Sequence, residues 1–354
     1  MVLGHGAGVN VLYEWFPYYS FHMPLFIFIS GWLFKADSCE NVHAACLYLY
    51  KKVKRLIIPY FLWNVVYGVL VNVLRHCGIV MFGQELSLKT LFVEPWYLGN
   101  QFVFNFAAWF VLALFLVQVS YCIIRTILYR YLHRKGEIVL LIVFMVLALL
   151  SVKLSNNDMI PAKWMPVFRS LFFLFFFHLG FCFKNFIWTY ADRINNVLYF
   201  GLLFLVQAVI LICYPDVNLS TITFTQFNNN ILIPFITSIT AIMFYLKIAT
   251  ILVPSLGNSK IIKYIGTNTW SVMMHHGLIF FLINSIFVLI SSFIHMEGID
   301  VTQYANNILW KYRLDIYQFQ IVYVILGIAV PILMKCCVWD RGIQYLKGSK
   351  KKCK

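Results

Sequence analysis

Long apolar runs alternate with short polar and charged clusters along the whole chain. A helix of about 20 apolar residues crosses the roughly 30 Å of hydrocarbon in a lipid bilayer, and nine runs approach or exceed that length. The pattern therefore predicts an all-α, polytopic bundle of membrane-spanning helices. The predicted spans cover residues 18–34, 56–76, 101–124, 138–154, 167–183, 195–213, 229–250, 269–293 and 316–338.

Composition and charge indicate whether the chain binds nucleic acid or lies in a lipid bilayer. Only 12% of the residues are charged, compared with about 25% in an ordinary soluble domain. The net charge of +15 would suit a nucleic-acid-binding protein, but the basic residues lie in short clusters between apolar runs, as they do beside membrane spans. We therefore expect the lipid bilayer as partner and no nucleic acid. The nine cysteines form no C-x-x-C pairs, so we expect neither disulfides nor a metal site.

The distribution of Lys and Arg over the loops predicts the orientation of the chain. Of the 28 basic residues, 21 lie in one set of alternate loops and in the C-terminal tail, and seven lie in the other set. Cytoplasmic loops carry the excess of positive charge. The C-terminus is therefore predicted to be cytoplasmic, and the protein is predicted to be a multi-pass protein of the cytoplasmic membrane.

The N-terminal residues predict an incomplete helix, and the C-terminal residues predict a basic tail. Residues 1–12 cover only about half a bilayer at 1.5 Å per residue, and the span at 18–34 must run inward. We therefore expect the chain to begin inside an incomplete first helix of a ten-helix protein. Residues 1–340 form the predicted transmembrane domain, and residues 341–354 form a basic cytoplasmic tail that attracts anionic lipid head groups.

Ionisable groups inside a membrane are costly, so each histidine in or beside a span is a functional candidate. His22 is followed by Met23 and Pro24; proline removes a backbone donor and frees carbonyls for a ligand or water. A structural kink with an interfacial histidine is the alternative. Ser30 and Gly31 favour close helix packing. The set comprises His5, His22, His178, His275 and His276, of which His178 is expected to be structural.

Three strings resemble a known family. Ser20–Phe34 reads SFHMPLFIFISGWLF, Trp109–Phe115 reads WFVLALF, and Tyr264–Ile279 reads YIGTNTWSVMMHHGLI. In order and predicted topology they resemble the acyltransferase 3 family of integral membrane O-acyltransferases, in particular its fucose 4-O-acetylase-like branch. The resemblance implies transfer of an acyl group, most simply acetyl, from acyl-CoA to a sugar hydroxyl in a bacterial inner membrane. Acetyl-CoA would be a substrate, with no permanently bound cofactor.

The resemblance also implies catalytic roles for His5 and His276, and His22 joins them as a third candidate because of its own sequence setting. Attack by a hydroxyl on a thioester needs a base, and the pKa of histidine suits that task near neutrality. His5 matches the catalytic histidine of the family's first helix, and His276, ten residues after Gly266, matches a second family histidine. His22 would shape the acceptor entrance. His275 and His276 point about 100° apart, so they cannot both face one cavity, and His275 is assigned to substrate binding.

Residues for the donor and the acceptor follow from the same resemblance. Lys52 and Arg55 match a basic pair that would hold the phosphates of coenzyme A, although positive-inside anchoring explains them too. Trp109 would line the acyl tunnel or belong to an interfacial belt. Asn268 would cap its helix and contact substrate. Two further acceptor candidates come from the residues alone. Glu14 would orient an imidazole or lie solvated in a loop, and Arg169 would bind an anionic acceptor or snorkel.

Two other classes of function fit part of the pattern. A transporter or flippase for polysaccharide or lipid-linked glycans also needs kinked spans with buried polar groups, but the chain has no visible internal repeat. A truncated, inert chain is the third reading. We expect the acyltransferase, with coenzyme A on Lys52 and Arg55 and with His5 as the base.

Overall fold

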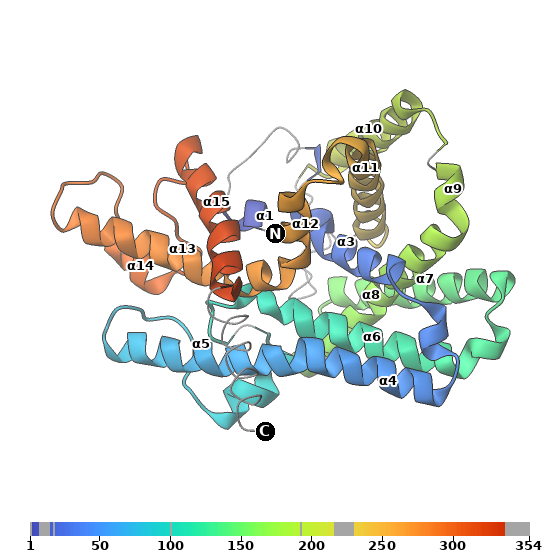
Figure 1. Ribbon diagram of the computed structural model, residues 1–354, viewed down its shortest axis with the longest axis horizontal. Helices are drawn as coiled ribbons and strands as arrows, with labels where there is room; N and C mark the ends of the chain where they lie inside the picture. The colour runs from blue at the N-terminus through green and yellow to red at the C-terminus, as the bar shows by residue number, and fades with distance from the viewer. Residues whose placement is uncertain are drawn as a thin grey trace, which may run out of the picture.

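The computed structural model describes residues 2–6, 15–16, 18–99, 101–191, 193–215 and 230–336, and the secondary structure of these residues is entirely helical. The predicted all-α bundle is confirmed (Figure 1). Short 3₁₀ and π turns join or extend several of the helices. The α-helices are α1 Val2–Gly6, α3 Tyr18–Trp32, α4 Val42–Lys52, α5 Ile58–His76, α6 Trp109–Leu128, α7 Arg134–Asn156, α8 Met165–Cys182, α9 Trp188–Ala191, α10 Asn196–Cys213, α11 Ile233–Leu256, α12 Lys260–Thr267, α13 Thr269–Ser291, α14 Val301–Asn306 and α15 Tyr317–Met334.

Eight helical stretches among the described residues are long and apolar enough to cross a membrane. The nine predicted spans exceed that number by one because α3 has only 15 residues, about 22 Å of helix at 1.5 Å per residue. The eight stretches are Val42–His76, Phe106–Tyr131, Arg134–Asn156, Ala162–Ala191, Asn196–Cys213, Ile233–Leu256, Thr269–Ser291 and Tyr317–Met334.

The predicted span at 101–124 is wrong at its start. Residues 101–105 form bends and turns, and regular helix begins only with the 3₁₀ turn Phe106–Ala108 and α6. This buried loop (residues 101–108) contains Phe102 and Phe104, both fully buried. Non-helical backbone at membrane depth is tolerated where protein surrounds it, so apolar composition alone did not distinguish this loop from a helix.

The basic cluster before the predicted span at 56–76 belongs to a continuous helix and not to a loop. α4 passes through the π turn Val53–Ile57 directly into α5 (Figure 1). A π turn rotates successive side chains differently from an α-helix. Residues three apart across the turn therefore need not share a face.

Two glycines bring α3 and α8 into backbone contact. A Cβ atom at Gly31 of α3 would overlap the carbonyl oxygen of Phe177, and one at Gly180 of α8 would overlap the carbonyl oxygen of Phe28. Small residues at helix crossings permit such approach in membranes. The close packing predicted at Gly31 is confirmed, and it makes α3 and α8 one rigid wall of the bundle.

Pro24 leaves the carbonyl of Ser20 without its helical donor, because that carbonyl lies four residues earlier in α3. The hydroxyl of Ser238 on α11 donates to this oxygen at 2.8 Å. The freed carbonyl predicted from the sequence thus exists, but a neighbouring helix uses it. Pro24 therefore helps to lock α3 onto α11.

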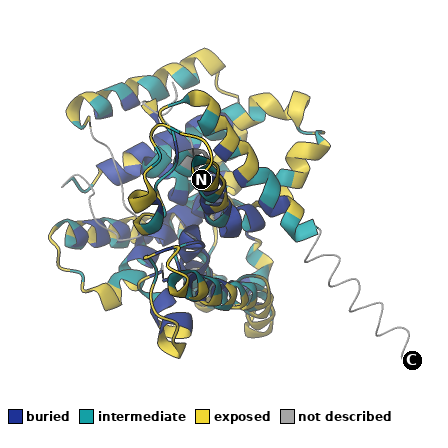
Figure 2. Ribbon diagram, turned by 90° about the vertical axis from the view of Figure 1, so that its left-hand side faces the viewer, coloured by how far each residue is buried: buried dark blue, intermediate teal, exposed yellow. Residues whose placement is uncertain are grey.

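Burial follows the expectation for a protein that lies in lipid. Buried residues concentrate in the interior, and the outer faces of several helices stay exposed (Figure 2). Many of these exposed residues are aliphatic, such as Leu62 and Val66 on α5 and Leu202 and Leu205 on α10. Soluble monomers rarely expose contiguous apolar patches of this kind. The aliphatic faces are suited to contact with acyl chains of the bilayer.

Candidate functional site

His5 and His276 meet inside the bundle, although 271 positions separate them in the chain. α1 carries His5 and packs against α13, which carries His276. The two imidazole rings stack with centroids 5.6 Å apart and planes inclined by 20°. The ring of Phe106 contacts both histidines edge-on. The structure therefore brings together two of the three predicted catalytic histidines.

Hydrogen bonds fix which nitrogen of His276 is basic. Nδ1 lies 2.9 Å from the carbonyl oxygen of Val272, and because a carbonyl only accepts, Nδ1 must carry the proton. Nε2 then holds the lone pair. It is buried and has no hydrogen-bond partner among the described residues, so His276 presents an unused proton acceptor beside His5.

Tyr19 orients His5. Its hydroxyl donates to the carbonyl of Gly4 at 3.3 Å and lies 3.0 Å from Nδ1 of His5. When the hydroxyl donates to the Gly4 carbonyl, it accepts from Nδ1 of His5, and Nε2 of His5 is then the basic nitrogen. Sequence reasoning missed Tyr19; its place three residues before His22, on the same helical face, was the available signal.

His22 lies next to this group. Its Nδ1 donates to the carbonyl of Tyr18, and its ring meets the ring of Tyr19 edge-on with centroids 5.4 Å apart. Tyr19 thus contacts both His22 and His5. His22 therefore lies beside the pair, with Tyr19 between them.

The buried loop (residues 101–108) walls the histidine pair on one side. A Cβ atom at Gly277 would come within 2.5 Å of the carbonyl oxygen of Phe104 and 2.9 Å of the Phe106 ring. The absence of a side chain at Gly277 lets the loop press against α13 next to His276. Contact between the buried loop and α13 at Gly277 therefore helps to fix the position of the His276 imidazole.

Two cavities lie near the pair, and both are lined by Trp270. The smaller, of about 170 Å³, is lined by Arg55, Trp63, His275 and Lys335 among others. The larger, of about 450 Å³, is mostly apolar and falls in the range of small-molecule sites. Its lining comprises Val2, Phe26, Ile29, Ser30, Leu56, Phe110, Val111, Leu114, Ile265, Thr269, Trp270, Val272, Met273 and Ile328.

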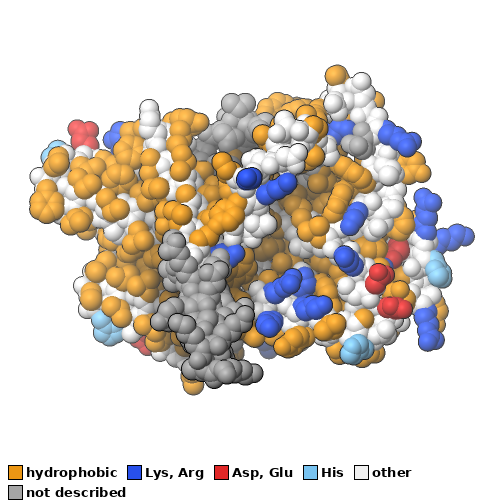
Figure 3. Space-filling model, in the orientation of Figure 1, with side chains coloured by type: hydrophobic (Ala, Val, Ile, Leu, Met, Phe, Trp, Pro, Cys, Tyr) orange, Lys and Arg blue, Asp and Glu red, His pale blue; other side chains and the backbone are white. Residues whose placement is uncertain are grey.

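Neither lining includes His5 or His276, but residues close to both histidines in the sequence reach the larger cavity. Val272 and Met273 precede His276 on α13, and Val2 precedes His5 on α1 by one turn. The face of the molecule in Figure 3 is hollowed near its centre, and Lys and Arg side chains lie around the hollow. A cavity with basic residues and an apolar cavity that share Trp270 are suited to an elongated anionic ligand with an apolar arm.

His275 faces away from His276, as predicted. It lines the smaller cavity, where the hydroxyl of Tyr67 lies 2.7 Å from its Nδ1 and the ring of Trp63 packs 4.3 Å from its own. The 100° between adjacent helical residues therefore turns His275 toward the smaller cavity and His276 toward His5.

Asn268 has a different role from the predicted cap. It occupies the N-cap position of α13, but its side chain makes no capping hydrogen bond. Its amide donates to the carbonyl of Tyr264 at 2.7 Å, and its oxygen accepts from Nζ of Lys335 at 2.6 Å. Asn268 thus positions Lys335 at the smaller cavity, a residue that sequence reasoning counted only as a positive-inside charge.

The remaining candidates lie elsewhere. Nζ of Lys52 lies 5.0 Å from the Tyr48 ring, and Lys52 is not in the lining of either cavity described here. Trp109 lies under the guanidinium of Arg169 at 4.8 Å. Arg169 is buried, so the snorkelling alternative is wrong. Glu14 and the basic tail lie outside the described residues.

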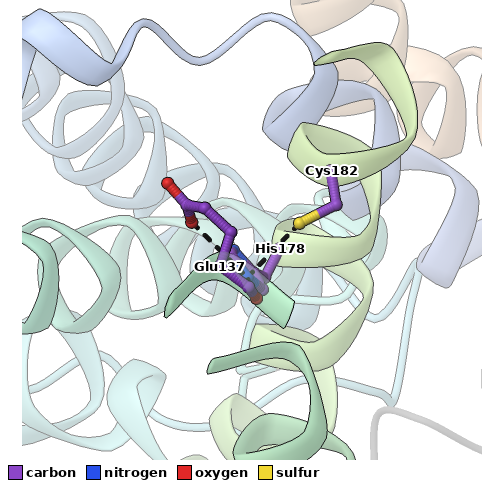
Figure 4. A group of neighbouring side chains, drawn as sticks. All are labelled: Glu137, His178 and Cys182. Carbon is purple, nitrogen blue, oxygen red and sulfur yellow. Dashed lines mark hydrogen bonds and ion pairs between the residues drawn. The ribbon is translucent and has the colours of Figure 1, made fainter. Parts of the chain in front are cut away.

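A second polar cluster is buried between α6, α7 and α8. Arg125 forms a bidentate ion pair with Glu137 at 2.9 and 2.6 Å. Nδ1 of His178 lies 2.9 Å from the Tyr121 hydroxyl, and its Nε2 lies 2.9 Å from the Glu137 carbonyl and 3.4 Å from Sγ of Cys182 (Figure 4).

Glu137, His178 and Cys182 lie close enough to hold a metal ion. However, the guanidinium of Arg125 already occupies both carboxylate oxygens of Glu137, and it would repel a second cation. The donor set fits a salt bridge better than a metal centre, in keeping with the structural role expected for His178.

Comparison with known families identifies the chain. The acyltransferase 3 family model, described as an acyltransferase domain, matches residues 1–336. No curated protein and no solved structure is detectably similar to the chain. The match covers nearly the whole sequence, and it favours an enzyme over the glycan transporter considered above.

Proposed function

Because the chain belongs to the acyltransferase 3 family and is a membrane acyltransferase, we propose that it transfers an acyl group, most simply acetyl, from acyl-CoA to a sugar hydroxyl. The observation that carries this proposal is the stacked pair of His5 and His276. Hydroxyl attack on a thioester needs a positioned base within a site that admits both reactants. The buried pair of His5 and His276, in which Nε2 of His276 has no partner among the described residues, meets the requirement for a positioned base.

The reaction follows from the assigned nitrogens. Nε2 of His5 takes the proton of the acceptor hydroxyl as the hydroxyl oxygen attacks the thioester carbonyl carbon. The carbon–sulfur bond then breaks, and the departing thiolate takes the proton from the imidazolium. The products are a sugar ester and free coenzyme A. Nε2 of His276 accepts a hydrogen bond from a second hydroxyl of the bound sugar and so holds the reacting hydroxyl beside His5.

The donor occupies the two cavities. Arg55 and Lys335 bind phosphates at the smaller cavity, since cations that are held at a mouth suit multiply charged groups. The indole rings of Trp63 and Trp270 offer faces for the adenine base. The larger apolar cavity takes the pantetheine arm, which ends near Val272 and Met273 beside His276. Lys335 thus replaces Lys52 as the partner of Arg55.

The setting is a bacterial cytoplasmic membrane with the C-terminus in the cytoplasm. Arg55 and Lys335 belong to the basic residues that are predicted to face the cytoplasm, so the donor enters from the cytoplasm, where acyl-CoA is made. The acceptor is a sugar of a polysaccharide or lipid-linked glycan. This topology derives from the bias of basic residues between alternate loops.

The test uses purified full-length chain in lipid nanodiscs and acetyl-CoA labelled in the acetyl group. We expect coenzyme A release and labelled sugar ester, with both lost in His5→Ala. Arg55→Ala and Lys335→Ala should raise KM for acetyl-CoA about tenfold or more, because each removes a charge-assisted contact of about 1.5–3 kcal/mol, while kcat stays close to wild type.

Arg130→Ala is the matched control, since Arg130 belongs to the same basic set but lies exposed in the turn between α6 and α7. It should leave KM unchanged. Full ester formation in His5→Ala would overturn the proposed base, and equal KM values in all three basic variants would overturn the proposed donor site.

A further inference from the structure

Lys311 approaches the histidine pair from the connection between α14 and α15, which we call the Lys311 loop (residues 307–316). Its Nζ lies 5.3 Å from the centre of the Phe280 ring, and that ring contacts His276 one helical turn away with centroids 5.5 Å apart. Lys311 is close enough to interact electrostatically with both His5 and His276. A cation therefore lies on the side of the pair opposite to the donor mouth.

A buried network holds the loop in place on both sides of Lys311. The amide of Asn284 donates to the carbonyl of Trp310 at 2.7 Å, and its oxygen accepts from the backbone N–H of Tyr312 at 3.3 Å. The Tyr323 hydroxyl donates to the same oxygen and accepts from the same N–H. Asn284 is only 3% exposed. Buried polar networks that are fully satisfied rigidify their surroundings, so Lys311 is presented from a fixed backbone.

Lys311 has no counter-ion in the part of the chain that the structure describes. Its Nζ donates to the carbonyl of Leu309 at 2.9 Å, but among the described residues no carboxylate oxygen lies within 4 Å. Arg313, two residues later, contrasts with it because Asp315 lies 3.6 Å from its Nε. Burial lowers the pKa of Lys311 to about 8. A preorganised and partly desolvated cation without an anion is arranged to receive one.

We propose that Lys311 is a specificity residue that binds an anionic group of the acceptor sugar and thereby places its hydroxyl at the histidine pair. The proposal rests on the acyl-transfer function proposed above and adds the chemical class of the acceptor. The shared chemistry is an anion, either a uronate carboxylate on the sugar ring or a phosphate on its anomeric carbon.

Distance favours the acceptor over the reacting centre as the partner of Lys311. Two steps, each slightly above 5 Å and passing through the Phe280 ring, join Nζ to the His276 ring. An oxyanion donor must lie about 3 Å from the reacting oxygen, whereas a sugar ring can bridge a longer gap between an anionic substituent and a reacting hydroxyl.

The test compares one neutral sugar with two anionic sugars. Equilibrium binding to the purified full-length chain is measured for p-nitrophenyl β-D-glucuronide, p-nitrophenyl β-D-glucoside and glucose 1-phosphate, and acetyl transfer to each is then measured with acetyl-CoA. We expect at least one anionic probe to bind about tenfold or more tightly than the glucoside. Lys311→Gln should abolish that preference by raising the Kd and KM of the anionic probe. Lys311→Arg should retain the preference.

Arg313→Asn is the matched control, because it removes a charge from the same loop. Asparagine also tolerates the left-handed backbone conformation of residue 313 (φ 49°). It should keep the preference. Equal binding of all three probes, or an unchanged preference in Lys311→Gln, would overturn the role of Lys311. Charge-selective binding without coenzyme A release would instead overturn acyl transfer and leave the anion site standing. Which anionic probe depends on Lys311 distinguishes the carboxylate from the phosphate.

Discussion

Two buried histidines in this protein have opposite surroundings. His178 uses both ring nitrogens, with the Tyr121 hydroxyl at one and the Glu137 carbonyl at the other. His276 uses only Nδ1, and its Nε2 faces no partner among the described residues. Burial is complete at both positions, so the capacity for chemistry follows from the free lone pair and not from depth in the membrane.

The same contrast extends to the cations near each histidine. Arg125 is paired by both oxygens of Glu137, whereas Lys311 has no carboxylate near it in the described part of the chain. The cluster on α6, α7 and α8 is thus closed, and the site formed by α1, α13 and the Lys311 loop is open. A closed cluster stabilises the bundle; an open one is ready for a substrate.

Replacing the two histidines should separate these roles most strongly. His276→Gln should lower kcat for acetyl transfer by about 10²–10⁴, the usual worth of a positioned proton-transfer or hydroxyl-binding group, with little change in the melting temperature. His178→Gln should lower the melting temperature and leave kcat per folded molecule near wild type. Thermal unfolding and initial rates measured on the same preparations check this, and the reverse pattern would refute the contrast.

Breaking the ion pair tests the closed cluster. Glu137→Gln leaves the Arg125 guanidinium buried without its counter-ion, so we expect a loss of about 3–5 kcal/mol in stability. The double variant Arg125→Met/Glu137→Leu should recover most of the loss, because it removes both charges. Denaturation in detergent measures the stabilities. A single variant as stable as the wild type would show that the pair contributes nothing.

Crowding the open site should have a smaller effect. Gly277→Ala places a methyl group within 2.5 Å of the Phe104 carbonyl oxygen and should cost about 1–3 kcal/mol through overpacking, with a fall in kcat as His276 shifts. Gly201→Ala is the control, because nothing lies within 4 Å of its added Cβ. Activity and melting temperature that match in the two variants would argue against the loop as a support of His276.

The mildest test uses pH. Burial lowers the pKa of Lys311 to about 8, so its charge is present below pH 8 and is lost as pH rises through that value. Preference for an anionic probe should therefore decline between about pH 7 and 9. The groups that face Lys311 are His5 and His276, and Asp315 of the same loop pairs with Arg313. Lys311→Arg should hold the preference through pH 9, because its guanidinium stays charged.

The sequence predicted the helical class and most spans because apolar runs report depth in the membrane. It did not predict that residues 101–105 leave the helix, since Phe102 and Phe104 are equally apolar in a buried loop and in a span. His5, His276 and Arg55 were found as single residues through family resemblance. Their neighbours Tyr19, Lys335 and Lys311 come close to them only through the way the helices rotate and cross. The spacing of apolar residues along the chain does not report which residues distant in sequence come together.

Trp270 lines both cavities, so one indole stands as the partition between a polar vestibule and an apolar chamber. We expect a smaller side chain at position 270 to join the two spaces and so to lengthen the molecule that the protein can accommodate.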